Sequence, residues 1–198
     1  MNQQIRITKS LVYKDTLRWD AHFSERGWLS KRFFIINHAV FSPRYRLVFW
    51  FRMAQLFREL HLRIAYNITA MIHRNNQLRT GIQLGINTLV GGGLVFPHYG
   101  SIVVTGYTRI GENATIFQQT TIGVVQGSKN TGAPIIGSNV VVSAGAIVIG
   151  HITIGDSVCI GAGAVVVKDV PDNAVVVGNP ARVISMDAER IVRCYLNA

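Results

Sequence analysis

The sequence has few acidic residues, few cysteines and no long apolar run. Ten aspartates and glutamates stand against 20 lysines and arginines, so the formal net charge is +10. The two cysteines, Cys159 and Cys194, have no CxxC partner and no metal-binding spacing, which favours a reduced, cytoplasmic chain. No apolar run reaches the roughly 18 residues that span a bilayer. The first ten residues, MNQQIRITKS, lack the apolar stretch of a secretory signal.

The positive charge is confined to the front of the chain. Residues 1–80 hold 14 lysines and arginines and 4 aspartates and glutamates, whereas residues 81–198 hold 6 of each. The 198 residues are enough for one compact domain with a small appendage, and a hydrophobic share of 48% is too high for a disordered chain. We therefore expect a basic front and a neutral back that meet different partners.

The back half repeats with a six-residue period. Aliphatic residues recur at every sixth position, and the residue four positions after each of them is aliphatic or alanine. The first set is Ile136, Val142, Val148, Ile154, Ile160 and Val166, and the second is Val140, Ala146, Ile152, Val158, Ala164 and Val170. A period of six fits neither an α-helix nor an alternating strand. It predicts an all-β solenoid, a parallel β-helix in which short strands and tight turns form stacked coils.

The period is interrupted twice. Ile122 and Ile136 are 14 positions apart, two more than two repeats, and the polar text VVQGSKNTGAP between them predicts a loop that leaves the coil. The second interruption shifts the register by two residues between Ile102 and Val104, beside PHYGS. His98 therefore lies at an irregularity in a regular rod, and irregular loops on rigid scaffolds commonly carry chemistry.

Two stretches resemble a known family of enzymes. Residues 136–184, which end in IGAGAVVVKDVPDNAVVVGNPARVI, resemble the hexapeptide-repeat acyltransferases. FPHYGSIVVTGYTRIGENATIFQQTTIG, residues 96–123, is similar to the serine acetyltransferase branch, and looks closer still to relatives from capsule, exopolysaccharide and lipopolysaccharide gene sets. The resemblance covers roughly residues 81–184. It implies a left-handed parallel β-helix, a homotrimer, and an active site between neighbouring protomers that binds acetyl-CoA.

The same resemblance makes His98 the general base that takes the proton of the acceptor hydroxyl. The chemistry fits, because a hydroxyl must lose its proton as it attacks a thioester, and an imidazole with a pKa near 6.5 can accept it. Such help is worth about 10²- to 10⁴-fold in rate. Gln118 matches a glutamine of serine acetyltransferases, and Gly123 lies in a turn whose backbone N–H could bind the oxyanion. The residues alone leave a second interpretation of His98 open, a structural histidine hydrogen-bonded in a turn.

Four more residues match family positions that bind the co-substrate. Ala144 and Ala162 match small residues along the pantetheine arm of coenzyme A, which needs a smooth ridge with main-chain partners. Lys168 and Arg182 match cations near its anionic nucleotide end. The alternatives are simple turn packing for the two alanines and ordinary solvated charge for Lys168 and Arg182.

No metal site is expected. The hexapeptide carbonic anhydrases, zinc enzymes with a related fold, need three histidines, whereas the repeat contains His98 and His151 alone. The other four histidines belong to the basic front and are expected at its surface or in its packing: His22, His38, His61 and His73.

The sequence departs from serine acetyltransferases at three places. Pro97 stands where that family has an aspartate before the histidine, and Gly132 and Ala133 stand where it has an Arg-His pair. Serine would lose charged partners worth roughly 1.5 to 3 kcal/mol each, which favours a neutral sugar hydroxyl as the acceptor. Gln83, fifteen residues before His98, replaces an acid that often orients the imidazole.

The chain divides into a basic helical region (1–80), a hexapeptide-repeat acyltransferase domain (81–184) and a C-terminal helix (185–198). Residues 42–74 read as one helix that begins at Ser42-Pro43. Its apolar residues recur at three- and four-residue steps, with Arg46, Arg52, Arg58 and Arg63 between them. We expect it to cover an open β edge of the solenoid; contact of its basic face with an anionic membrane is the alternative. No nucleic-acid motif is present, so nucleic acid is not an expected partner.

The leading hypothesis is an acetyl-CoA-dependent O-acetyltransferase that acts on a sugar of a surface polysaccharide or its precursor. It would work in the cytoplasm, at most peripheral to the inner face of the membrane. The first alternative is a serine O-acetyltransferase of cysteine biosynthesis, which shares the chemistry and differs in the acceptor. The second is a non-catalytic β-helix scaffold, for which Gln83 is the best support.

Overall fold

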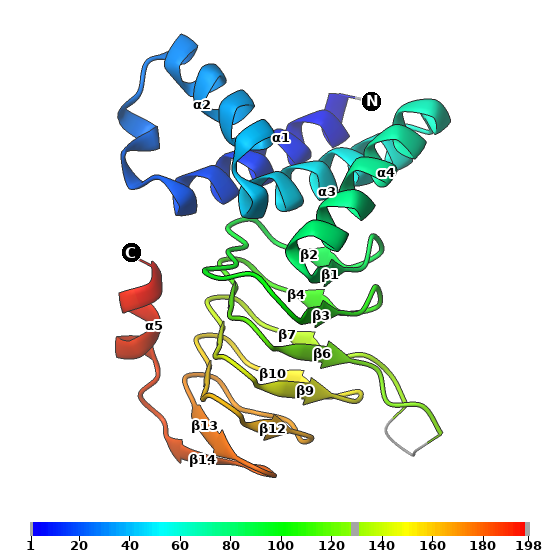
Figure 1. Cartoon of the computed structure of the whole chain (residues 1–198). Coiled ribbons are helices and arrows are strands. Elements are labelled where there is room, and N and C mark those ends of the chain that lie inside the picture. Colours follow the sequence, from blue (N-terminus) through cyan, green and yellow to red (C-terminus); the bar gives the residue numbers. More distant parts are fainter. Residues whose placement is uncertain (1, 128–130, 197–198) are drawn as a thin grey trace.

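Five α-helices flank a stack of short strands in the computed structural model, which describes residues 2–127 and 131–196. Four helices come first: α1 (Asn2–Trp19), α2 (Trp28–Phe41), α3 (Pro43–Glu59) and α4 (Arg63–Thr80), with a 3-10 turn, η1 (Ala21–Glu25), after α1. The fifth, α5 (Glu189–Leu196), follows the strands. Figure 1 shows the four helices grouped at one end of the stack and α5 along its side. None of the helices in the described ranges is both long and apolar enough to span a membrane.

The strands form three sheets, here called A, B and C. Sheet A holds β1 (Ile82–Leu84), β3 (Ile102–Val104), β6 (Thr121–Gly123), β9 (Ile147–Ile149) and β12 (Val165–Val166). Sheet B holds β2 (Leu89–Val90), β4 (Arg109–Ile110), β7 (Ile135–Ile136) and β10 (Thr153–Ile154). Sheet C holds β5 (Thr115–Ile116), β8 (Val141–Val142), β11 (Cys159–Ile160), β13 (Val175–Gly178) and β14 (Ala181–Ser185). The described strand pairs are parallel except for the terminal pair β13–β14.

The chain visits the three sheets in turn, so each circuit adds a strand to the stack (Figure 1). Val141 pairs with Cys159, and Ile147 pairs with Val165, in each case 18 positions further along the chain. One circuit is therefore three six-residue units. All members of the two predicted inward sets are buried, with exposures of 6% or less. The six-residue period and the core that it predicts are confirmed.

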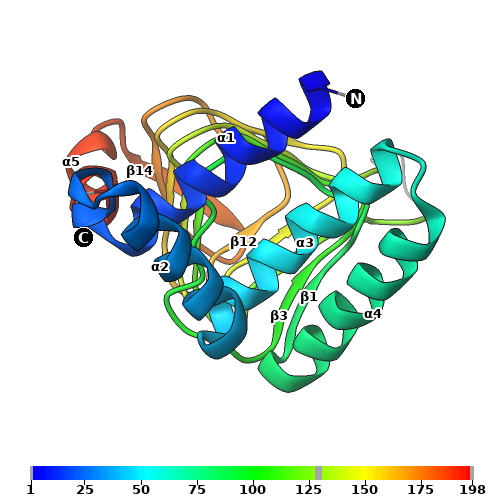
Figure 2. The same cartoon turned by 90° about the horizontal axis from the view of Figure 1, so that it is seen from above.

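The core of the circuits continues into the helices that lie across their end. Leu47, Val48 and Phe51 of α3 belong to the same buried cluster as Ile82 and Leu84 of β1. Figure 2, which looks down on this end, shows α1, α3 and α4 side by side over the stack. The prediction that the basic front covers an open end of the β structure is confirmed.

The single helix predicted over residues 42–74 is wrong, because the chain reverses between α3 and α4. His61 adopts a left-handed backbone conformation with φ of 56°, and its N–H donates to the carbonyl of Arg58 at 3.0 Å. The apolar spacing is similar on both sides of this reversal, so periodicity gave no sign of it. α4 then runs back to β1, where the buried ring of His73 lies 2.9 Å from the Leu84 carbonyl through Nε2. Burial lowers the pKa of His73.

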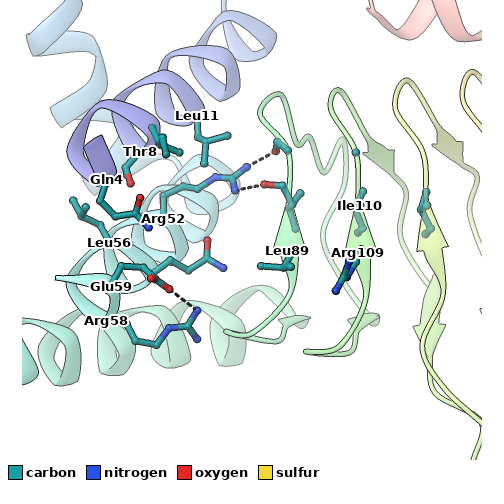
Figure 3. A pocket seen from close by; sticks show the side chains of 16 residues that line it. Gln4, Thr8, Leu11, Arg52, Leu56, Arg58, Glu59, Leu89, Arg109 and Ile110 are labelled. Carbon is teal, nitrogen blue, oxygen red and sulfur yellow. Dashed lines mark hydrogen bonds and ion pairs between the residues drawn. The ribbon is translucent and has the colours of Figure 1, made fainter. Parts of the chain in front are cut away.

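Arg52, expected on a polar helix face, is instead buried in an ion pair with Asp15 of α1. Its side chain is 1% exposed, and Nε lies 3.0 Å from Asp15 Oδ2. The guanidinium also donates to the carbonyls of Val90 and Gly91, each at 2.6 Å (Figure 3). Asp15 Oδ1 in turn accepts the backbone N–H groups of Gly93 and Leu94 at 2.7 and 3.0 Å. The pair thus satisfies polar backbone groups on the first circuit that the helices would otherwise bury unpaired.

The pocket drawn in Figure 3 lies beside this ion pair, between α1, α3 and the first strands of sheet B. Its volume is about 460 Å³, and Leu11, Leu56, Leu89 and Ile110 supply much of its apolar wall. None of the residues matched to the acyltransferase site lines it. The pocket belongs to the contact between the helices and the circuits.

The predicted C-terminal helix packs back on the outer face of sheet C. Ala188 and Val192 are buried in a small cluster with Val141, Cys159 and Val175. Burial raises the pKa of the Cys159 thiol, which makes it a poor nucleophile. The tail predicted as a helix over residues 185–198 is helical from Glu189 to Leu196, whereas Ser185 belongs to β14 and residues 197–198 lie outside the described ranges.

We expect Arg52→Met to lower the free energy of unfolding by about 3 to 5 kcal/mol, because it leaves the Asp15 carboxylate buried without its counter-charge. Chemical denaturation measures this loss. Glu112→Gln is the matched control, since it breaks the exposed Lys14–Glu112 pair, which is worth at most about 1 kcal/mol. Equal losses in the two variants would contradict the role given to the buried pair.

Candidate active site

His98 lies on the turn that joins sheet C to sheet A in the first circuit, residues 96–102, here called the histidine turn. Val95 bridges to Thr115, and Val103 pairs with Thr121. Val95 and Val103 are eight positions apart, whereas their partners are six apart. The first circuit therefore carries two extra residues in this turn. The irregularity predicted beside His98 is present, but its two residues lie before Ile102 and not between Ile102 and Val104, which both pair within β3. His98 is exposed on this turn.

The backbone of the histidine turn is held at both ends and strained between them. Phe96 and Ile102 are fully buried and fix the two ends in the core. Gly100 has φ of 112° and Ser101 has φ of 53°, and the first value is one that residues with a side chain rarely adopt. The N–H of Gln119 in the next circuit donates to the Gly100 carbonyl at 3.1 Å. The turn is thus a defined shape.

The ring of His98 lies against one aromatic ring, that of Phe117, and has no hydrogen-bond partner among the described residues. Its centroid is 6.1 Å from that of Phe117, which meets Tyr195 of α5 edge to face at 5.5 Å. Both ring nitrogens are therefore open to a ligand. A structural histidine would need a hydrogen bond in the turn, and the described part of the chain supplies none.

Gln118, Ala144 and Ala162 follow the histidine turn down the same corner of the next three circuits. The N–H of Gly145 donates to the Gln118 carbonyl at 3.0 Å, and the N–H of Gly163 donates to the Ala144 carbonyl at 2.9 Å. The side-chain oxygen of Gln118 is buried and has no partner in the described residues. The structure thus brings the predicted base, Gln118 and the two predicted arm-binding alanines into one column.

The other predicted residues lie elsewhere on the single chain. The prediction that Gly123 lies in a turn is wrong: it is the last residue of strand β6 and pairs with Ile149, because the strand continues one residue past Ile122. It lies at the edge of sheet A opposite to the histidine turn. Lys168 follows β12 near that same edge, and its side chain is exposed. Arg182 lies on β14 at the last circuit, and it donates only to the neighbouring Ala181 carbonyl, at 3.0 Å, among the described residues. One chain does not bring these three to His98.

A groove of about 1010 Å³ runs along the outer face of sheet A, between the first circuits and α4. Gln83 of β1, Val103 of β3 and Thr121 of β6 form its floor, and Ser101 of the histidine turn lies at its end. Arg74 of α4 lies in its wall and is the one charged side chain among the described lining residues. Among the described residues, Gln83 forms no hydrogen bond with the His98 ring, so it does not orient that ring in this structure.

The predicted loop leaves the circuits between β6 and β7 (Figure 1), and its residues 128–130 lie outside the described ranges. Gly132, on the returning side, has φ of 150° and packs on His151: a Cβ built there would lie 2.9 Å from the His151 Cβ. Gly132, which stands where serine acetyltransferases carry an arginine, thus has no room for a side chain. No group of three or more histidine, cysteine, aspartate or glutamate side chains in the described ranges could hold a metal ion.

Comparison with known proteins identifies the family, although no family model matches the chain. The serine acetyltransferase of Helicobacter pylori is 37% identical over 133 residues, which are 67% of this chain and 78% of that protein. This chain belongs to the serine acetyltransferase family. The enzyme of that name from Staphylococcus xylosus is 35% identical over 137 residues, 69% of this chain and 63% of that protein. The chain therefore spans about six-tenths of the length of the first curated relatives that it matches.

Solved structures of the family share the fold. The soybean serine acetyltransferase apoenzyme superposes with a TM-score of 0.71 at 26% identity, over 90% of this chain and 69% of that one. The Brucella abortus serine acetyltransferase in complex with coenzyme A gives 0.69 at 24% identity, over 90% and 68%. Both matches extend well beyond the β circuits into the helical front. In the sequence, this front resembled the family only in its general character and not in any motif.

The expected closeness to polysaccharide O-acetyltransferases is wrong, and with it the sugar acceptor. Curated relatives at 32–37% identity are serine acetyltransferases. The inference went wrong because Pro97, Gly132 and Ala133 show which charged partners are missing, and they do not show what replaces them. Sequence reasoning missed Arg74 and Gln77 of α4, which the fold brings to the groove. It also missed Tyr195 of α5, whose ring meets that of Phe117, the neighbour of the His98 ring. Arg74 carried a weak signal, a charge just before the first repeat.

We expect Gly100→Ala to lower the free energy of unfolding by about 1 to 3 kcal/mol, because alanine is strained at this φ even though its Cβ would have open space. Gly27→Ala is the control: that Cβ also meets nothing within 4 Å, and φ there is −63°. Because Gly27 is the N-cap of α2, where alanine is less favourable than glycine, this control should cost at most about 1 kcal/mol. Denaturation curves of the two variants that coincide would contradict a strained histidine turn.

Proposed function

We propose that this protein transfers the acetyl group of acetyl-CoA to the side-chain hydroxyl of serine. The observation that carries the proposal is His98, exposed on a turn with two extra residues and without a hydrogen-bond partner in the described ranges. An imidazole in that state can take a proton from a hydroxyl near neutral pH. Membership of the serine acetyltransferase family supports serine as the acceptor.

The proposed reaction is a single acyl transfer in which His98 first accepts a proton and then donates it. His98 removes the proton of the serine hydroxyl as its oxygen attacks the thioester carbon of acetyl-CoA. The tetrahedral intermediate collapses as the C–S bond breaks, and the coenzyme A sulfur takes the proton from the His98 imidazolium. The products are O-acetylserine and coenzyme A. Gln118 lies one circuit below the turn and is the assigned side-chain contact for this centre, and Gly123 is the assigned backbone donor to the oxyanion.

Acetyl-CoA is assigned to the corner column below the histidine turn. Ala144 and Ala162 have side chains small enough to let the pantetheine arm approach backbone groups of the turns. Lys168 and Arg182 are exposed cations for the nucleotide end. The chain's own contribution is thus a narrow ridge that directs the thioester upward to His98.

Arg74 is the group that we assign to the carboxylate of serine. It is exposed in the wall of the groove, and no ion pair occupies it among the described residues. Gly132 and Ala133 leave the carboxylate without the partners found in the relatives, so a cation from α4 takes that role. The Gln83 side chain on the groove floor supplies an oxygen for the ammonium group.

We further propose that three copies assemble and that the coil is left-handed, as the resemblance implies. The exposed side of α4 beside the groove is apolar: Ile64, Ile68, Met71 and Leu78 are 51–79% exposed. A neighbouring protomer would cover this surface. It would also bring the opposite edge of its own sheet A, with Gly123 and Lys168, toward the histidine turn.

We expect His98→Ala to lower kcat with L-serine by about 10²- to 10⁴-fold, because the hydroxyl loses its general base. Thiol release measures the rate, and calorimetry should find acetyl-CoA binding unchanged. His22→Ala, an exposed histidine of the front, is the control and should keep full activity. No acetyl-CoA binding by the unaltered protein, or undiminished turnover in His98→Ala, would overturn the proposal.

Arg74→Gln should raise the KM for serine by about tenfold or more, because a hydrogen bond to a charged group is worth about 1.5 to 3 kcal/mol. The KM for acetyl-CoA should not move. Arg79→Gln is the matched control, an exposed arginine on the same helix that does not line the groove. Equal effects of the two substitutions on the KM for serine would remove Arg74 from the acceptor site.

A further inference from the structure

One side of α2 is apolar over the length of the helix and is not covered by the described residues. Leu29, Phe33, Ile36 and Val40 recur at steps of four, three and four residues, so they share one side, here called the α2 face. Their exposures are 73%, 73%, 64% and 48%. The opposite side of α2 packs normally, with Phe34 against Phe23 at 5.5 Å and a buried Ala39. The helix is therefore apolar on two sides, and only one of them serves the core.

Cations and a tryptophan border the α2 face. Trp28 is 66% exposed at the start of the helix, and the Arg32 guanidinium lies over its ring at 4.7 Å. At the other end, Arg46 donates to the Val40 carbonyl at 2.9 Å. α2 itself carries Lys31 and Arg32 and no acidic residue. An exposed apolar helix side with basic residues and tryptophan at its border is a feature of helices that lie in a membrane interface.

We infer that the α2 face binds an anionic lipid surface with the helix lying in its plane. The apolar side chains enter the boundary of the acyl chains, and Arg32 and Arg46 meet lipid phosphates. Figure 1 shows α2 at the end of the molecule opposite to β14, so this contact leaves the circuits and the groove in water. The inference concerns a different surface from the membrane contact considered for residues 42–74, where Leu47, Val48 and Phe51 of α3 are buried against the circuits.

The charges favour a lipid surface over a second copy of the chain. Two α2 faces in contact would bring Lys31 and Arg32 of each copy together, with no acidic residue on either helix to neutralise them. The nearest acids in the sequence lie before the helix: Asp20 pairs with Arg26, and Glu25 lies 3.3 Å from His22. Residues 1–80 hold 14 basic and 4 acidic residues, so the whole front of the molecule is attracted to negative charge.

Sedimentation with vesicles tests the inference on the full-length protein. We expect binding to phosphatidylcholine vesicles that contain roughly one-third phosphatidylglycerol, little binding to pure phosphatidylcholine, and weaker binding as salt is raised. Phe33→Ser with Ile36→Ser should lower the vesicle affinity about tenfold or more, and Arg32→Gln about fivefold. Ile184→Ser, an exposed apolar residue of β14 at the other end of the molecule, should bind like the unaltered protein.

Three outcomes would overturn the inference. The first is no sedimentation with either vesicle. The second is equal loss in the Ile184→Ser control, which would mean that any exposed apolar residue contributes. The third is a lower molecular mass of Phe33→Ser/Ile36→Ser in light scattering, which would mean that a second copy covers the α2 face. Serine turnover in vesicle-free solution tests the proposed function separately, because the inference does not depend on the acceptor.

Discussion

The first circuit depends on one buried ion pair. A stack of coils ends in an open row of backbone groups, and a helix laid across it would bury them without partners. Asp15 accepts two of the N–H groups and Arg52 donates to two of the carbonyls, so the pair converts that end into a surface on which helices can pack. The histidine turn begins two residues after Leu94, the last of these groups. Its position relative to the helices therefore depends on charges that never meet the substrate.

The candidate site forms where a regular structure borders an irregular one. The repeating circuits supply a column of small residues at fixed height, which suits a long, thin co-substrate. The two extra residues of the first circuit supply the exposed imidazole. The helical front supplies Arg74, a charge that the neutral repeats do not offer on this groove. Each region thus contributes what the others lack, and the groove lies along their border.

The circuits could be predicted from the sequence because each six-residue unit must place one side chain in a narrow core. In the two repeating sets, only aliphatic side chains and alanine occupy these inward positions. A shift in phase was therefore visible by counting, and it located His98. Arg52 was misplaced because its partner lies on α1, 37 positions away, and helical spacing describes only the helix itself. The reversal at His61 preserved the apolar spacing and left no trace in it. The acceptor was misjudged for a related reason, since a missing local partner says nothing about a replacement from another element.

The two-residue insertion has a consequence for how such proteins diversify. Circuits are separated by the strand spacing of a sheet, about 4.8 Å, and every circuit offers an equivalent corner. An insertion of the same kind one circuit lower would move the imidazole by one such step along the ridge, with the fold around it unchanged. The distance between the reacting atom and the far end of the co-substrate is then determined by the number of circuits between them. On this scaffold, such insertions can change that distance only by whole circuits.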